Sequence, residues 1–233
     1  MTDIYNVVHS KYGYNQFEMF LMVLITGITN FVVIPAIIII RKQRMDFQFY
    51  MSIFTLITSF MYHTLESVDC KFFIIEEGGW HRLDNVGSIV CFQMLFTQLS
   101  DLQNLHLETM LNYFGLFITF VAQAKSPWDL NYTVGPILLQ LFICIFLIIK
   151  RRRLPKLNKQ KMKKGLMILM AAVVFFSLSQ DEYKDYLRFY HGMWHTTVGL
   201  FSFYIWQSKC EVEFTWQNFY TIPTLKESYY KDE

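Results

Sequence analysis

Two histidines, His191 and His195, open a stretch of the chain that is otherwise almost wholly apolar. In a helix, residues four positions apart project from one face, so the two imidazoles would lie one turn apart. This is a spacing with which two histidines bind one zinc ion. The alternative is a pair of histidines at a membrane interface, hydrogen-bonded to backbone groups or lipid headgroups. The choice depends on which other polar groups reach the same depth.

The composition is typical of a membrane protein. Of the 233 residues, 53% are hydrophobic and 17% are charged, whereas about a quarter of a soluble domain is charged. A membrane-spanning helix needs about 20 mostly apolar residues. The segments that meet this loosely are 17–40, 47–64, 83–99, 108–124, 132–149, 165–179 and 189–206. We therefore expect an all-α, seven-transmembrane helix bundle of the plasma membrane or endomembranes, with a kink or tilt at Pro35 in the first span.

The basic residues orient this bundle. If the N-terminus lies outside, the side that holds the C-terminus collects 15 of the 21 Lys and Arg residues, so the positive-inside rule predicts a cytosolic C-terminus. Nine of these residues lie in the connection 150–164. Because aromatic side chains are absent there, this connection suits anionic lipid and not nucleic acid. We expect residues 1–206 to form one domain and residues 207–233 to form a cytosolic tail.

The expected topology brings polar groups from three helices to one depth. The second span ends outside, and the third and seventh spans begin outside, which places these four residues near the outer surface: His63, Asp84, His191 and His195. Along the second span, polar residues recur at steps of three or four and share one helical face: Ser52, Thr55, Ser59, His63 and Glu66. Ionisable groups within spans are rare and suggest a function.

Three histidines with an open fourth position are typical of catalytic zinc sites, whereas closed structural sites usually have four protein ligands. His63, His191 and His195 form such a set. Zinc is favoured by ligand type, although imidazoles also suit copper, nickel and iron. We therefore predict a zinc site with these three ligands and a fourth position for water or substrate.

At these residues the sequence resembles the CREST superfamily of membrane proteins. The resemblance rests on "SFMYH" (Ser59 to His63), on Asp84 at the head of the next span, and on "HGMWH" (His191 to His195) at the head of the last. It covers all seven expected spans and is greatest with the transmembrane protein 8 and myomaker branch; the superfamily also includes alkaline ceramidases and progestin and adipoQ receptors. It implies a seven-helix bundle, zinc on the three histidines, and contact of Ser59 and Asp84 with the metal-bound water.

The function that we expect is a zinc-dependent intramembrane lipid hydrolase. Asp84 would accept a proton from water and return it to the leaving group, and Ser59 would orient the water or stabilise the oxyanion. The substrate would be an amide or ester of a membrane lipid. The alternative comes from another class: a non-enzymatic, membrane-remodelling or fusion protein whose zinc joins helices, as in myomaker.

Several other residues have simpler interpretations. His81 and His106 are expected to be solvated imidazoles in loops. Glu66 either supports His63 or is only a charge at a helix end. A membrane-interface belt is predicted for four tryptophans: Trp80, Trp128, Trp194 and Trp206. Neither a disulfide framework nor a thiolate metal site is expected, because the cysteines lie far apart: Cys70, Cys91, Cys144 and Cys210.

Overall fold

The computed structural model describes residues 12–68, 72 and 74–209. Its helices, in chain order, are α1 (Gln16–Met22), a π-helical stretch (Val23–Gly27), a 3-10 helix (Ile28–Val33), α2 (Ile34–Lys42), α3 (Asp46–Val68), α4 (Glu77–Leu99), α5 (Leu105–Lys125), α6 (Leu130–Arg151), α7 (Lys159–Leu178), a 3-10 turn (Tyr186–Arg188) and α8 (Phe189–Ser208). An isolated bridge joins Phe72 and Ile75. The all-α expectation is therefore confirmed for the described residues.

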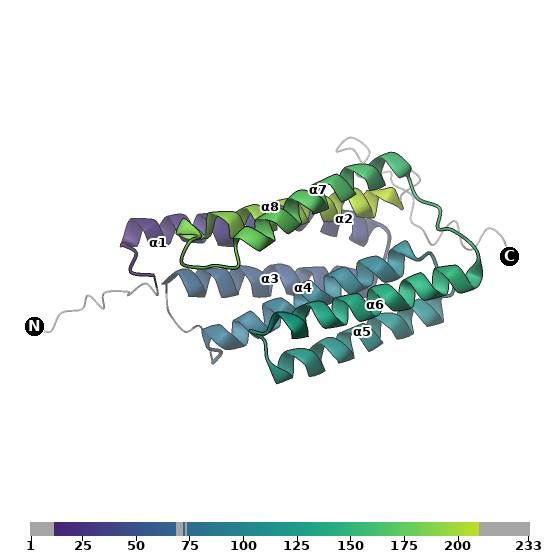
Figure 1. Cartoon of the computed structure of the whole chain (residues 1–233), viewed down its shortest axis with the longest axis horizontal. Coiled ribbons are helices and arrows are strands. Elements are labelled where there is room, and N and C mark those ends of the chain that lie inside the picture. The colour runs from purple at the N-terminus through teal and green to yellow at the C-terminus, as the bar shows by residue number, and fades with distance from the viewer. Residues whose placement is uncertain (1–11, 69–71, 73, 210–233) are drawn as a thin grey trace, which may run out of the picture.

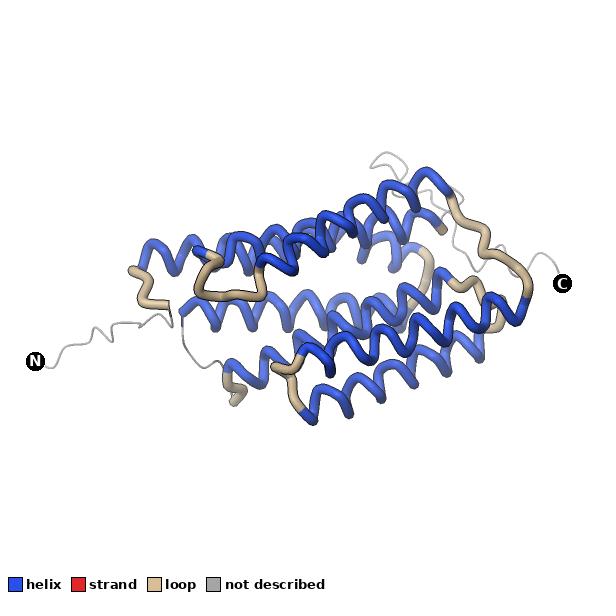
Figure 2. The backbone as a smooth tube through the Cα atoms, in the orientation of Figure 1, coloured by secondary structure: helices blue, strands red, loops and turns tan. Residues whose placement is uncertain are grey.

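The helices form an elongated bundle of two groups (Figure 1, Figure 2). The N-terminal helical run, from α1 to α2, packs with α8, and α8 packs along α7. In the other group, α4 contacts α3, α5 and α6. The first group contacts the second mainly through α3, which packs against both the N-terminal run and α4. A side chain on α3 can therefore meet side chains of both groups.

Many polar residues lie inside the bundle, beside its hydrophobic core, and many large apolar residues lie on its surface. Within the described residues, three helical stretches are long and apolar enough to cross a membrane: Gln16–Lys42, α5 and α6. The helices α3, α4, α7 and α8 are more polar but have 20 to 23 residues, a length of about 30 Å or more. On α3, His63 and Glu66 are fully buried, whereas on α5 and α6 Phe117 and Phe142 are 63% and 64% exposed. A membrane bundle has this distribution, because lipid cannot satisfy polar groups.

The helical run Gln16–Lys42 is irregular just before Pro35, where a kink or tilt is expected. Regular α-helix gives way to the π-helical stretch and then to the 3-10 helix. Proline has no backbone N–H and its ring collides with the carbonyl one turn earlier. Side chains accompany the change in backbone pairing: Thr29 donates to the Ile25 carbonyl at 2.6 Å, and Asn30 donates to the Thr26 carbonyl at 2.7 Å. Such side-chain bonds keep an irregular helix viable in an apolar environment.

Two glycines allow α8 to approach this irregular stretch closely. A Cβ atom at Gly192 would collide with the carbonyl oxygen of Ile25, and one at Gly199 would lie 3.0 Å from the carbonyl carbon of Val32. Both glycines are on one face of α8, seven residues apart. Small residues at helix interfaces in membranes permit backbone-to-backbone packing of this kind. The close approach holds the N-terminus of α8 against the bundle.

Some expectations change with the structure. The helix α8 continues to Ser208, two residues beyond the expected span, with Gln207 and Ser208 buried; residues 210–233 lie outside the described part. The belt interpretation is wrong for Trp206, which is 4% exposed in the hydrophobic core, because its side of α8 faces α2. Cys91 and Cys144 are free thiols, and Cys70 and Cys210 lie outside the described residues.

We predict that Gly192→Ala lowers the midpoint of thermal unfolding in detergent, because the added methyl group displaces the Ile25 backbone. Overpacking of this kind costs about 1–3 kcal/mol. Gly78→Ala in the first turn of α4 is the control, since no atom lies within 4 Å of its added Cβ. Alanine is favoured over glycine in a helix by up to about 1 kcal/mol, so a lower midpoint in Gly192→Ala alone reports the packing. Equal midpoints for the two variants would contradict the close approach of α8.

Candidate metal centre

Three imidazoles from two helices meet inside one end of the bundle. His63 projects from α3, and His191 and His195 project from the first turns of α8. The Nε2 atom of His63 lies 3.2 Å from Nε2 of His191 and 3.0 Å from Nε2 of His195. One nitrogen of each ring lies within 4.8 Å of the others. The structure thus brings together the three residues predicted as zinc ligands.

The spacing of these nitrogens suits a small divalent metal. Two nitrogens that bind zinc at ~2.05 Å with a tetrahedral angle lie about 3.3 Å apart. The distances at His63, 3.2 and 3.0 Å, are close to this value. The donor set of three imidazoles is one that zinc accepts. The residues therefore fit the metal predicted from the sequence.

Glu66 determines which nitrogen of His63 faces the other histidines. Its Oε2 atom lies 3.1 Å from Nδ1 of His63, and neither side chain is more than 1% exposed. A carboxylate only accepts hydrogen bonds, so Nδ1 of His63 carries the proton and Nε2 keeps its lone pair. Metal-binding histidines commonly have such a carboxylate behind them. Of the two interpretations from the sequence, the one in which Glu66 supports His63 agrees with this geometry.

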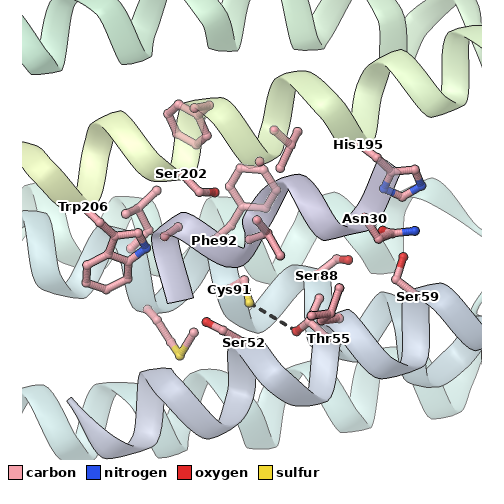
Figure 3. Close-up of a pocket in the computed structure, with 18 of the residues that line it drawn as sticks. Asn30, Ser52, Thr55, Ser59, Ser88, Cys91, Phe92, His195, Ser202 and Trp206 are labelled. Atoms are coloured by element: carbon pink, nitrogen blue, oxygen red, sulfur yellow. Dashed lines mark hydrogen bonds between the residues drawn. The ribbon is translucent and has the colours of Figure 1, made fainter. Parts of the chain in front are cut away.

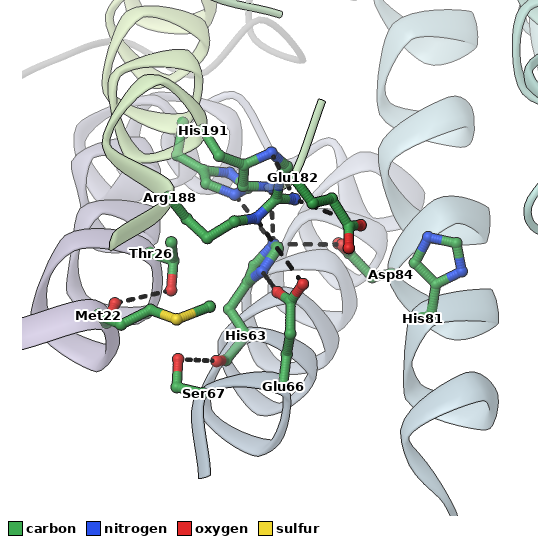
Figure 4. Close-up of polar contacts among 12 residues, drawn as sticks. Met22, Thr26, His63, Glu66, Ser67, His81, Asp84, Glu182, Arg188 and His191 are labelled. Atoms are coloured by element: carbon green, nitrogen blue, oxygen red, sulfur yellow. Dashed lines mark hydrogen bonds and ion pairs between the residues drawn. The ribbon is translucent and has the colours of Figure 1, made fainter. Parts of the chain in front are cut away.

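A buried arginine, shown beside Glu66 in Figure 4, and a tyrosine complete the polar cluster around this carboxylate. Arg188, 4% exposed, places its Nε 3.7 Å from Glu66 and its Nη2 3.4 Å from Nδ1 of His191. The Tyr12 hydroxyl donates to Glu66 at 2.9 Å and lies 3.2 Å from Glu182. Burial, with the negative charges of Glu66 and Glu182, raises the pKa of Tyr12 above its ordinary value. Tyr12 therefore remains a donor and links the N-terminal segment to the site.

The backbone before α8 is shaped to present His191. Leu187 and Arg188 have positive φ angles, 52° and 55°, which cost energy in residues other than glycine. The buried carboxylate of Asp185 accepts from the backbone N–H groups of Tyr190, at 2.8 Å, and His191, at 3.1 Å. These bonds satisfy first-turn donors of α8 that have no helical partner. Sequence reasoning missed Asp185 and Arg188, and the only sequence signal was an acidic and a basic residue just before an apolar helix.

The two predicted catalytic residues lie beside the histidines. Asp84, 7% exposed and about two turns into α4, places Oδ2 3.7 Å from Nε2 of His63. The Ser88 hydroxyl donates to the Asp84 carboxyl at 3.5 Å, and the Ser59 hydroxyl lies near the same carboxyl. Ser59 is one turn before His63 on α3, so both face the same way. All five predicted site residues therefore gather in one place.

A cavity of about 100 Å³ begins at this cluster and extends along the bundle axis (Figure 3). His195 and Ser59 line one end of it, and Trp206 lines the other. One wall carries small polar side chains of α3 and α4, namely Ser52, Thr55, Ser59, Ser88 and Cys91. The opposite wall comes from the N-terminal helical run and α8 and is mostly apolar, with Asn30 and Ser202 among its polar side chains. A group at the metal centre therefore has a partly apolar space directly beside it.

The interpretation of His81 as a solvated loop residue is wrong. His81 lies in α4, and its ring stacks on Trp128 at a centroid distance of 3.7 Å and lies 4.8 Å from the ring of Tyr62. The helix α4 begins at Glu77, before the predicted span, and this extra turn carries His81 into contact with the bundle. His106, at the start of α5, is exposed.

Comparison with known proteins identifies a family. Residues 18–196 match the family described as "protein of unknown function (DUF3522)". The match covers more than half of the 233 residues, so the chain belongs to this family. It includes all five predicted site residues. No curated protein matches the chain.

We predict that purified protein holds about one zinc ion per chain, and that His63→Ala, His191→Ala and His195→Ala each lose it, because two imidazoles bind zinc far more weakly than three. Metal content by mass spectrometry checks this. His106→Ala is the matched control, since His106 is exposed and at the start of α5. A folded protein without metal after exposure to zinc would reduce the cluster to hydrogen-bonded histidines.

We also predict that Glu66→Gln weakens zinc binding by roughly 10–100-fold, because the neutral amide no longer raises the basicity of His63 or fixes its tautomer. Competition with a chelating dye measures the affinity. Glu18→Gln is the control: Glu18 is a half-buried carboxylate whose hydrogen bonds, from Tyr186 at 2.8 Å and from the backbone N–H of Asn15, do not involve the histidines. An unchanged zinc affinity in Glu66→Gln would mean that Glu66 only balances the charge of Arg188.

Proposed function

We propose that this member of the DUF3522 family is a zinc-dependent hydrolase that cleaves an amide or ester of a membrane lipid. One observation carries the proposal: His195 and Ser59 belong to the metal centre and also line the cavity beside it. A hydrolytic site for lipids needs a polar reacting centre next to an apolar space for the acyl chain. The resemblance to CREST proteins, of which alkaline ceramidases hydrolyse lipid amides, supports the same function.

The protein works as a seven-span membrane bundle with its N-terminus outside and its C-terminus in the cytosol. The lengths of α3, α4, α7 and α8 and the apolar surfaces of α5 and α6 support the seven spans. The distribution of charge supports the orientation, since Arg41, Arg151 and Lys159 lie at the helix ends opposite the metal centre. The site then lies near the outer leaflet, where lipid carbonyls meet water.

Each polar residue of the site has a role in hydrolysis. Zinc, when bound by the three histidines, supplies a Lewis acid that makes hydroxide available at neutral pH. Asp84 takes a proton from the attacking water and passes it to the departing amine or alcohol. Ser59 donates to the carbonyl oxygen as negative charge develops there. The C–N or C–O bond breaks, the acyl carbon gains the hydroxyl group, and a fatty acid and an amine or alcohol leave.

A second candidate is a non-enzymatic protein in which zinc joins helices for membrane remodelling. The polar cluster favours it, because Tyr12, Glu66 and Arg188 link the N-terminal segment, α3 and the start of α8 around the histidines. Such a site needs neither Asp84 nor Ser59. Their position beside Nε2 of His63 therefore favours the hydrolase.

We predict that Asp84→Asn lowers the release of fatty acid from mixed micelles of amide and ester lipids by about 100-fold or more, because the proton acceptor is lost. The zinc content and the midpoint of thermal unfolding should stay near those of the unchanged protein. Mass spectrometry of the released acid measures turnover. Asp46→Asn is the control, because Asp46 is exposed and pairs with Arg41 far from the site. If Asp84→Asn keeps full turnover, Asp84 is not the proton acceptor; if no lipid of the panel is cleaved by the unchanged protein, the remodelling function leads.

A further inference from the structure

One polar side chain of the N-terminal helical run enters the cavity next to the metal centre. Asn30 lies in the 3-10 helix Ile28–Val33 and lines the cavity. It is only 8% exposed. Figure 3 shows it beside His195 and Ser59. Neither the five site residues nor the resemblance to CREST proteins involves this helix.

The hydrogen bonds of Asn30 determine which end of its amide is occupied. Its Nδ2 atom donates to the carbonyl oxygens of Thr26, at 2.7 Å, and Gly27, at 3.2 Å. The opposite assignment would set the amide oxygen against two carbonyl oxygens, so the network supports this orientation. Both donors point back to the helix, and the Oδ1 atom therefore faces away from it, on the cavity side.

No hydrogen bond reaches Oδ1 of Asn30 from the described residues. The neighbouring polar groups at this end of the cavity face other partners: Nε2 of His195 lies 3.0 Å from Nε2 of His63, and Ser59 lies near the Asp84 carboxyl. An acceptor that faces a cavity and has no partner within the protein is commonly satisfied by water or by a ligand. Beside a metal centre, this points to a ligand with a hydrogen-bond donor.

We propose that Asn30 selects lipids that carry an N–H or O–H donor next to the acyl carbonyl. This inference rests on the proposed hydrolase and names the class of substrate. A lipid amide, or an ester with a neighbouring hydroxyl, donates to Oδ1 of Asn30 while its carbonyl lies at the metal centre. A plain ester offers only oxygen acceptors there and leaves the Asn30 oxygen unpaired. Sites built around a polar contact discriminate strongly against ligands that lack it.

Three matched probes test the selection without any need for turnover. Ethyl palmitate has no donor, N-ethylpalmitamide replaces one ester oxygen by N–H, and ethyl 2-hydroxypalmitate adds an O–H. Each is titrated into zinc-loaded protein in detergent, and quenching of tryptophan fluorescence reports binding, since Trp194 and Trp206 line the cavity. The unchanged protein should bind each donor-bearing probe about tenfold more tightly than ethyl palmitate, the effect of one hydrogen bond.

The variant Asn30→Leu should keep its zinc and lose this preference, with the affinity for ethyl palmitate unchanged or higher. Comparing ratios within each protein removes differences in how the probes partition into micelles. Asn112→Leu is the matched control, because Asn112 is equally buried but lies on α5, outside the cavity lining. If leucine overfills the cavity and the variant does not fold, Asn30→Ala takes its place.

Three results would overturn the inference: equal affinities of the unchanged protein for all probes, a preference that survives in Asn30→Leu, or loss of zinc with an equal loss of affinity for every probe. The last would mean that Asn30 supports the metal centre. A donor preference that depends on Asn30, in a protein that cleaves none of the probes, would keep the selection and overturn only the hydrolysis.

Discussion

The contact between His63 and Glu66, buried inside α3, is the interaction on which the arrangement of one end of the bundle depends. Two ionisable side chains in an apolar interior are tolerated only when their remaining polar atoms are also satisfied. Glu66 obtains Tyr12 and Arg188 as partners, and Nε2 of His63 obtains His191. The N-terminal segment, α3 and the start of α8 are consequently held together at this end.

A second constraint is how closely α8 must approach for its histidines to reach α3. Gly192 removes the side chain that would collide with the backbone at Ile25, and the carboxylate of Asp185 holds the first turn of α8 in place. The same irregular stretch of helix that receives Gly192 also turns Asn30 into the cavity. Pro35, which cannot donate to the preceding turn, accounts for much of this irregularity. The close packing of α8 and the proposed selectivity of Asn30 for lipids with a hydrogen-bond donor therefore both depend on the irregular helical run before Pro35.

The proposed chemistry follows from the meeting of two environments. At the metal centre, carboxylates, imidazoles and hydroxyls crowd together, while the far end of the cavity lies against Trp206 in the hydrophobic core. Lipid carbonyls occupy a comparable boundary between polar headgroups and apolar chains. A structural metal clamp needs the histidines and Glu66 alone. The neighbouring cavity, lined by Ser59 and Asn30, and the adjacent Asp84 are what the proposed hydrolase adds.

The sequence by itself determined the helical class, the apolar surface and the set of five side chains around one centre. Helical periodicity, a local property, places Ser59 and His63 on one face of a helix. The alternation of spans brings Asp84, His191 and His195 to the same end of the bundle. It left open whether Glu66 supports His63, and it misjudged His81 and Trp206, because burial depends on neighbours far away in the chain.

Only the tertiary structure joined Arg188 and Tyr12 to the site. The same holds for the orientation of Asn30, which follows from a change of helix type that no periodic pattern records. Packing decides the contacts between segments more than 100 residues apart, such as that of His191 with His63. Its physical basis is the pairing of buried polar atoms and the close approach of helices at glycine.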